Sequence, residues 1–253
     1  MNTVMLGKEK VHKGALVLVN ERYPVLDGNR MGLSPVDERF SGILMKRDAI
    51  NVLRLILEKI SAIGRIVPVS GYRTSEEQRE IYENSLRENG GEFTRKFVAL
   101  PDHSEHQTGL AIDLALNAPD IDFICPEFPY DGICGDFRKA APDYGYIERY
   151  PAGKEKITGI AHEPWHFRYV GFPHSAIIAQ KGFALEEYVE FIKAYNSENR
   201  FVFEREGKPP MEIFYVPAVS GTTRVSMPAR CIYQVSGNNA DGFIVTVWRK
   251  ENE

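Results

Sequence analysis

The sequence lacks several features that would place a chain of this length in a specialised class. No apolar run in its 253 residues approaches the ~18 residues that a membrane-spanning helix needs. Charged residues interrupt the first twenty positions, unlike a signal peptide. The net charge is −4 with no basic stripe, which argues against nucleic-acid binding. We therefore expect a cytoplasmic globular protein that binds no membrane and no nucleic acid, whose oligomeric state the sequence does not indicate.

Cysteine is also scarce. The three cysteines, Cys125, Cys134 and Cys231, are an odd and sparse set, which is not a disulfide framework. Cys125 and Cys134 are close enough in sequence for a bridge or a metal site. Two reduced thiols are the simpler interpretation, because cytosolic thiols usually stay reduced.

The hydrophobic patterning predicts a chain of mixed elements followed by a β-rich end. Short strands and loops are expected over residues 1–45, and the later segments are clearer. Helices are expected at 48–64, from Ser75 to Gly90, at 135–145 and at 185–195, and strands at 65–70, 109–116 and within 157–172. Beyond residue 196 short β-like runs alternate with Gly, Pro and Asn turns. We predict two parts, residues 1–196 and a small β-rich extension of unknown role at 197–253.

A first cluster of chemically active residues lies in the segment Ser104–Asp113. In a strand, Asp113 would share one face with Ala111 and Ala115, whose small side chains leave room beside the carboxylate. Gly109 lets the backbone turn so that His106 approaches that carboxylate. Alternatively, the aspartate is bonded to a loop and the histidine lies on the surface. A buried aspartate needs a metal or an arginine, because an unpaired buried carboxylate costs several kcal/mol.

A second cluster reads His162-Glu163-Pro164-Trp165-His166. It matches H-E-x-x-H, in which two histidines one helical turn apart bind zinc. The flanking residues favour strands, however, and without a helix this spacing has no geometric meaning. We prefer the interpretation in which His166 is a ligand, Glu163 is the base and His162 has no role.

Together, His106, Asp113 and His166 offer two imidazoles and one carboxylate. Three protein ligands leave a fourth position for water, as in a catalytic zinc site. Glu163 would accept the proton of that water and return it to a leaving amine. Zn²⁺, one ion per chain, is the cofactor that this set predicts.

Arg73 stands in the predicted strand-to-helix turn Ser70–Thr74. It would either point into a cleft and stabilise an oxyanion or pair on the surface with Glu76 or Glu77. Gln78 would either contact substrate or complete a capping box at the start of the helix.

These motifs resemble those of the D-Ala-D-Ala zinc metallopeptidases. The sequence S-E-H-Q-T-G-L-A-I-D fits their S-x-H-x-x-G-x-A-x-D signature, E-P-W-H fits their E-x-x-H, and S-G-Y-R-T, E-E-Q-R-E-I-Y and P-W-H-F-R-Y-V-G also agree. The matches extend from about Val67 to Tyr195. Within the family the chain is most similar to the bifunctional D,D-dipeptidase/D,D-carboxypeptidases of vancomycin-type glycopeptide resistance.

The resemblance implies an α+β fold with a central antiparallel sheet, flanked by helices, at the zinc site. It also implies metal ligation by His106, Asp113 and His166, with Glu163 as the base and Arg73 as the oxyanion stabiliser. Substrate binding would fall to Ser104, Gln78 and Trp165.

The implied substrates are small peptides: free D-Ala-D-Ala and the soluble pentapeptide precursor of the cell wall. Cleavage of another wall-peptide bond, of the L-Ala-D-Glu type, needs the same catalytic residues and stays open. A peptide-binding module without catalysis also stays open, although it would need neither Glu163 nor Arg73.

Overall fold

The computed structural model describes residues 2–26 and 31–248, which form two compact units. One unit is Val19–Ala184, and the other combines Met1–Leu18 with Leu185–Glu253. The divisions between the units thus differ from the predicted boundary at residues 196 and 197, and a separate role for residues 197–253 stays a prediction. No helix in the described ranges is long and apolar enough to cross a membrane.

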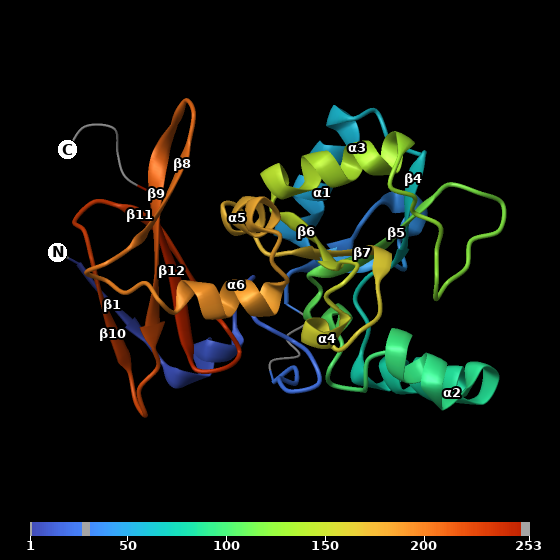
Figure 1. The fold of residues 1–253 in the computed structure, drawn as a ribbon, viewed down its shortest axis with the longest axis horizontal. Coiled ribbons are helices and arrows are strands. Elements are labelled where there is room, and N and C mark those ends of the chain that lie inside the picture. The colour runs from blue at the N-terminus through green and yellow to red at the C-terminus, as the bar shows by residue number, and fades with distance from the viewer. Residues whose placement is uncertain (1, 27–30, 249–253) are drawn as a thin grey trace. The chain divides into compact units, whose positions relative to one another are not determined.

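A four-stranded antiparallel sheet in the order β4-β5-β7-β6 organises the unit Val19–Ala184. Helices α1 and α3 lie together on one side of this sheet and α2 lies on the other (Figure 1). The elements of this unit are β2 (Leu33–Pro35), η2 (Glu38–Phe40), β3 (Leu44–Lys46), α1 (Arg47–Lys59), β4 (Ile66–Ser70), α2 (Ser75–Phe97), η3 (Glu105–Thr108), β5 (Ala111–Leu116), α3 (Gly132–Ala140), η4 (Ala141–Tyr144), β6 (Tyr146–Tyr150), α4 (Glu155–Thr158), β7 (Glu163–Tyr169) and α5 (His174–Lys181).

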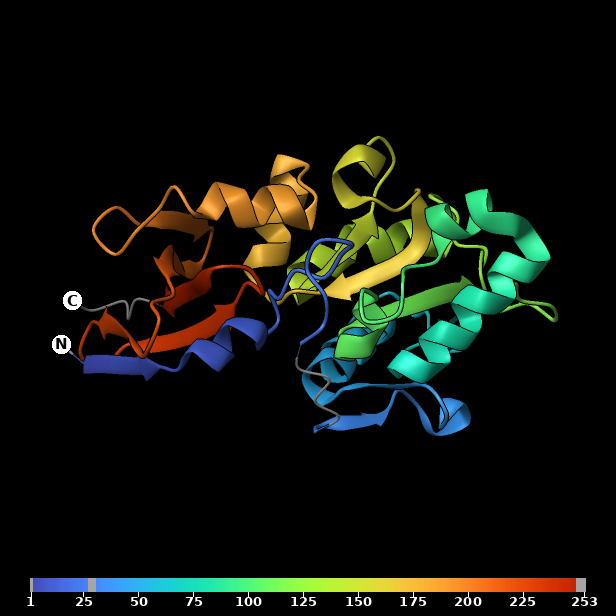
Figure 2. The ribbon, with the colours of Figure 1, turned by 90° about the horizontal axis from the view of Figure 1, so that it is seen from below.

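Apolar side chains of α1 and β5 build much of the core of this unit. Leu53 and Ile56 of α1 pack with Ile112 and Leu114 of β5, whose side chains point to the same side of the sheet. Figure 2 views this unit from the side of the sheet on which α2 lies. Burial of one face of β5 leaves its opposite face, with Asp113, available for polar chemistry.

The cysteines form no disulfide in the described ranges. Cys125 and Cys134 pack with the hydrophobic core, and their being two reduced thiols stays a prediction.

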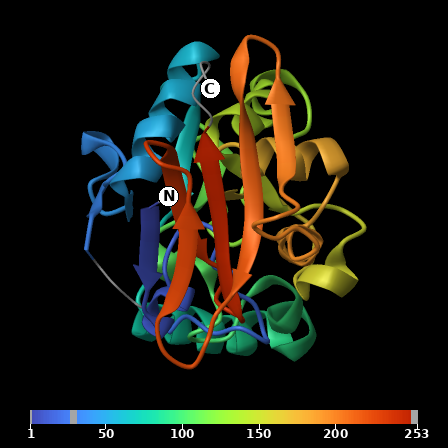
Figure 3. The same cartoon turned by 90° about the vertical axis from the view of Figure 1, so that its left-hand side faces the viewer.

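The second unit is built from strands at both ends of the chain. Its main sheet has the antiparallel order β11-β12-β9-β8, and β1 pairs with β10 (Figure 3). Its elements are β1 (Asn2–Leu6), η1 (Lys8–His12), α6 (Leu185–Ile192), β8 (Phe201–Arg205), β9 (Lys208–Pro217), β10 (Thr223–Met227), β11 (Ile232–Gly237) and β12 (Gly242–Trp248). The mixed α+β fold with antiparallel sheets and a β-rich C-terminal part is thus confirmed.

Candidate metal centre and active site

Asp113 occupies the centre of the sheet of residues 19–184. It lies on β5, opposite Ser70 of β4 and opposite His166 of β7. Directly opposed residues of neighbouring antiparallel strands have side chains only about 5 Å apart. The register of the sheet therefore brings His166 to Asp113 from 53 residues further along the chain.

His106 comes to the same carboxylate from η3. The turn after η3 is closed by Gly109, whose φ of 70° is left-handed and whose Cβ, if it had one, would lie 2.6 Å from Leu33 Cδ2. The Nδ1 atom of His106 lies 2.7 Å from the carbonyl oxygen of Gly71, to which it donates. The Nε2 atom then faces Asp113 Oδ2 at 3.1 Å, with its lone pair free for a metal.

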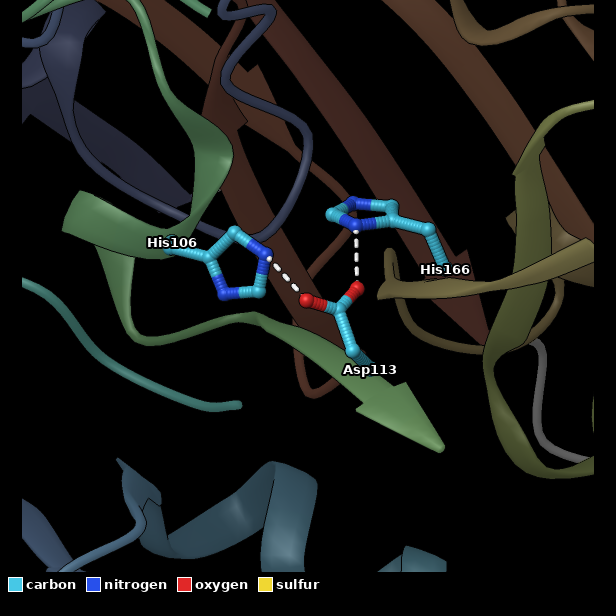
Figure 4. Close-up of side chains that lie close together, drawn as sticks. All are labelled: His106, Asp113 and His166. Atoms are coloured by element: carbon cyan, nitrogen blue, oxygen red, sulfur yellow. Dashed lines mark hydrogen bonds and ion pairs between the residues drawn. The ribbon is translucent and has the colours of Figure 1, made fainter. Parts of the chain in front are cut away.

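The three side chains converge in a buried metal-binding triad (Figure 4). His166 Nδ1 lies 2.8 Å from Asp113 Oδ1, and one ligand atom from each residue lies within 4.8 Å of the others. Two nitrogens and a carboxylate oxygen are a donor set that suits zinc, and three protein ligands leave a position open. The residues thus fit a catalytic zinc ion, and the sequence prediction that they meet is correct.

The two imidazoles differ in pKa, because they have different charged neighbours. Burial lowers the pKa of His106 to about 4, and the Arg73 charge acts in the same direction. Burial would also lower the pKa of His166, but the carboxylates of Asp113, Glu105 and Glu163 together outweigh it and raise that pKa to about 9. Burial alone would raise the pKa of Asp113, yet the two histidines hold it well below its usual range. Asp113 is therefore ionised and available as an anionic ligand.

Glu163 is the first residue of β7 and lies beside the triad. Its Oε2 atom is 3.8 Å from His166 Nδ1, and its side chain is buried. Burial raises the pKa of Glu163 to about 8, and the nearby Asp113 adds to this effect against the opposing charge of His166. A carboxylate with a pKa near neutrality can both accept and return a proton.

Arg73 follows β4 and points inward. Its Nη2 atom lies 3.5 Å from Asp113 Oδ2, its Nη1 donates to Gln78 Oε1 at 3.1 Å, and only 15% of its side chain is exposed. Gln78 Nε2 donates in turn to the carbonyl of Ala99 at 2.7 Å. The alternative of a surface arginine paired with Glu76 or Glu77 is therefore wrong. The capping box of α2 is formed by Thr74 and Glu77, one residue earlier than predicted and without Gln78.

A pocket of about 520 Å³, its open mouth included, gives access to these groups. Every residue that the sequence analysis selected for the site lines it: Arg73, Gln78, Ser104, His106, Asp113, Glu163, Trp165 and His166. Glu105 and Tyr150 also line the pocket and were not predicted from the sequence. Glu105 stands inside the predicted motif, and its charge in a buried segment was the available signal. Tyr150 gave no signal.

His162 lies outside this group. Its Nε2 atom is 2.6 Å from the hydroxyl of Tyr130 and 3.5 Å from Glu148, and 32% of its side chain is exposed. The segment from Glu163 onward is a strand, so the two histidines of H-E-x-x-H do not share a helical face. The helical interpretation of this motif is wrong.

A metal-binding triad with an open position, a buried carboxylate and an arginine, all lining one pocket, defines a metal-dependent hydrolase. Residues 42–172, slightly more than half of the chain, match the model of the family VanY: D-alanyl-D-alanine carboxypeptidase. The chain therefore belongs to the VanY family of D-alanyl-D-alanine carboxypeptidases.

Two curated relatives agree with this assignment. A D-alanyl-D-alanine carboxypeptidase of Enterococcus faecium is 35% identical over 96% of this chain and 78% of its own length. The bifunctional D-Ala-D-Ala dipeptidase and carboxypeptidase VanXYC of Enterococcus gallinarum is 52% identical over 49% of this chain and 66% of its own length.

Two solved structures extend the comparison. The vancomycin resistance D,D-dipeptidase VanXYg, in complex with a D-Ala-D-Ala phosphinate analogue, is 62% identical with a TM-score of 0.97, over 98% of this chain and 99% of that one. A mutant VanY D,D-pentapeptidase from a VanB-type resistance cassette, in complex with Zn(II), is 28% identical with a TM-score of 0.57, over 69% and 98%. The resemblance to bifunctional D,D-peptidases, and the prediction of a metallopeptidase, are thus confirmed.

Proposed function

We propose that this chain hydrolyses the D-Ala-D-Ala bond of the free dipeptide and of the soluble pentapeptide precursor, with one zinc ion per chain. The observation that carries the proposal is the buried triad beside Glu163 in one pocket. The similarity to VanXYg over nearly the whole chain supports the substrate, and the zinc-bound VanY structure supports the metal. With this activity, the protein would act in vancomycin resistance by removing D-Ala-D-Ala ends. A cytoplasmic location, where both substrates would be met, is part of the proposal.

His106, Asp113 and His166 hold the metal in this mechanism. A bound zinc ion supplies Lewis-acid chemistry, since it polarises a carbonyl and makes water more acidic. Glu163 accepts the proton of the attacking water and returns it to the leaving amine. Its burial suits this exchange, because the raised pKa brings the protonated and ionised forms close in free energy.

Arg73 places a fixed positive charge at the edge of the triad, where it stabilises the oxyanion that develops on the carbonyl oxygen. Gln78 holds the guanidinium in position through its side-chain oxygen. Ser104 and Trp165 line the same pocket and are assigned to substrate binding, Ser104 to the terminal carboxylate.

The proposal is tested by release of D-Ala from the dipeptide and, separately, from the pentapeptide precursor, with and without a zinc chelator. Glu163→Gln should keep zinc and lower kcat by about 10²- to 10⁴-fold. His162→Ala is the matched control from the same motif and should keep both zinc and activity.

Release of D-Ala from only one of the two substrates would limit the proposed activity to that substrate. Bound zinc with no release from either would refute it in favour of another wall-peptide bond, such as L-Ala-D-Glu, or of the peptide-binding module.

Arg73→Lys gives an independent test of the oxyanion assignment. Lysine keeps the charge but cannot reach Gln78 and Asp113 together, because it lacks the planar fork of arginine. We expect kcat on D-Ala-D-Ala to fall about 100-fold while the zinc content is unchanged. Unchanged kcat would remove Arg73 from the mechanism.

A further inference from the structure

Glu105 is a buried carboxylate that the proposed mechanism does not use. It precedes the ligand His106 in η3 and is fully buried. Its Oε1 atom lies 2.8 Å from Arg149 Nε and 2.8 Å from Arg168 Nη1. Both guanidinium groups are also completely buried, on the neighbouring strands β6 and β7. Three charged side chains are thus collected in the interior next to the triad.

The second oxygen of Glu105 faces a metal ligand. Its Oε2 atom lies 3.8 Å from Nε2 of His166, which is the ring nitrogen turned away from Asp113. Both atoms are buried, and neither has a hydrogen-bond partner within the described part of the chain. Buried polar atoms are rarely left in this condition, because each has lost its hydrogen bonds to water without replacing them. The two orphaned atoms are each other's available partner.

The same surroundings fix the ring of His166 from another side. The Tyr150 ring lies with its centroid 4.9 Å from that of His166, and the guanidinium carbon of Arg149 lies 4.9 Å from the Tyr150 centroid. Arg149 therefore supports both the carboxylate and the aromatic ring that contact His166.

A histidine can bind a metal through one nitrogen when its other nitrogen donates a hydrogen bond. His106 does this through the Gly71 carbonyl. We propose that Glu105 performs this task for His166: it is a positioning residue that accepts the Nε2 hydrogen, leaving Nδ1 for the metal. Arg149 and Arg168 hold Glu105 ionised and in place. This inference rests on the zinc site of the proposed function and assigns that site a buried support of one carboxylate and two arginines.

The charges agree with this assignment, because the two guanidinium groups beside Glu105 are the ion-pair partners that a buried carboxylate needs. An anion facing the outer nitrogen also strengthens the imidazole as a ligand.

The first test needs no variant. In the zinc-loaded protein with ¹⁵N-labelled histidine, NMR of the ring nitrogens should show His166 protonated at Nε2 and metal-bound through Nδ1. His106 should show the opposite arrangement and serves as the internal reference. His166 bound through Nε2, or with its Nε2 hydrogen in rapid exchange with solvent, overturns the proposal.

The second test measures zinc affinity by competition with a chelator, and the Co²⁺ absorption spectrum of the substituted protein. Glu105→Gln should weaken zinc binding by about 10- to 100-fold and shift the Co²⁺ bands. Glu212→Gln is the matched control, since Glu212 is another buried carboxylate paired with an arginine, 2.8 Å from Arg200, in the other unit. It should leave both readouts unchanged.

Glu105→Gln leaves two buried guanidinium groups without an anion, so it can prevent folding. Glu105→Asp keeps the charge and withdraws the carboxylate by one methylene, and it should fold with the same weakened zinc site. A folded variant with wild-type zinc affinity and an unchanged Co²⁺ spectrum overturns the positioning role. Failure of the wild-type protein to bind zinc would instead refute the proposed function, so the two failures are distinguishable.

Discussion

At the scale of single residues, three histidines of the unit Val19–Ala184 show that the groups around a side chain decide its protonation and its role. His106, His166 and His174 are equally buried, each with 3% of its surface exposed. The first two share the carboxylate of Asp113. Burial lowers the pKa of His174 to about 3. The same residue type is thus a metal ligand in one place and a neutral core group in another.

The state of His174 makes the stability of the protein depend on pH. The folded pKa of about 3 lies below the usual 6.5, so below pH 6.5 only the unfolded chain takes up a proton. Stability is therefore retained above pH 6.5 and lost as pH falls from there toward 3. Between pH 7 and 5 the free energy of unfolding of the wild type should fall by about 2 kcal/mol more than that of His174→Gln. Each pH unit below 6.5 contributes ~1.4 kcal/mol to this difference. Urea unfolding at several pH values measures the difference, and parallel curves would contradict a neutral buried His174.

The sequence was enough to select the metal triad and Glu163, but it left the orientation of Arg73 open. Asp113 was predictable because the two-residue period of a strand shows which side chains share its face. Arg73 stayed ambiguous, because whether an arginine after a strand points inward depends on a carboxylate 40 residues away. Glu105 was missed for the same reason: its partners Arg149 and Arg168 are brought to it only by strand pairing.

At the scale of elements, α2 shows a tertiary contact that extends a helix beyond the glycine predicted to end it. Its start was predicted close to the observed position, but its end was not: the helix breaks at Gly90, with φ 79° and ψ 166°, and then resumes to Phe97. The hydroxyls of Ser85 and Thr94 meet at 2.8 Å across the break, and Thr94 also donates to the Gly90 carbonyl. A buried contact thus holds the second segment against the first, which glycine statistics do not reveal.

Two adjacent glycines of α2 should respond to alanine in opposite ways. Gly90→Ala should lower the free energy of unfolding by about 1 kcal/mol, because a side chain is strained at that positive φ although nothing blocks the space. Gly91 has no left-handed φ, and its Cβ would meet the flexible end of Arg95 at 3.4 Å and Leu86 Cδ2 at 3.9 Å, an ordinary van der Waals contact. Gly91→Ala should therefore raise stability by up to about 1 kcal/mol. Denaturant unfolding of both variants checks this, and equal effects would show that the break is not fixed at Gly90.

At the scale of the whole molecule, the two ends of the chain build one unit. Leu6 on β1 lies opposite Thr223 of β10, and its side chain is buried with Phe214 and Phe243. The short apolar run at the N-terminus gave no indication of this partner, because pairing across more than two hundred residues leaves no periodicity in either strand. The β-rich end was recognisable from its turns, whereas the contribution of the first residues to it was not.

The two tryptophans of the chain divide between the units, so each unit can be followed separately. Trp165 lies in the unit of the metal triad and Trp248 in the other. Zinc binds the folded triad, so in a Trp248→Phe background it should raise the unfolding midpoint that Trp165 reports. The shift should grow with the ratio of zinc concentration to the dissociation constant.

In a Trp165→Phe background, Leu6→Ala should lower the free energy of unfolding that Trp248 reports by about 2–4 kcal/mol and leave zinc affinity unchanged. Leu53→Ala, in the buried core of the unit Val19–Ala184, is the matched control and should lower the zinc-sensitive transition in the Trp248→Phe background. If both tryptophans report one midpoint that zinc and Leu6→Ala shift alike, the two units fold as a single cooperative structure.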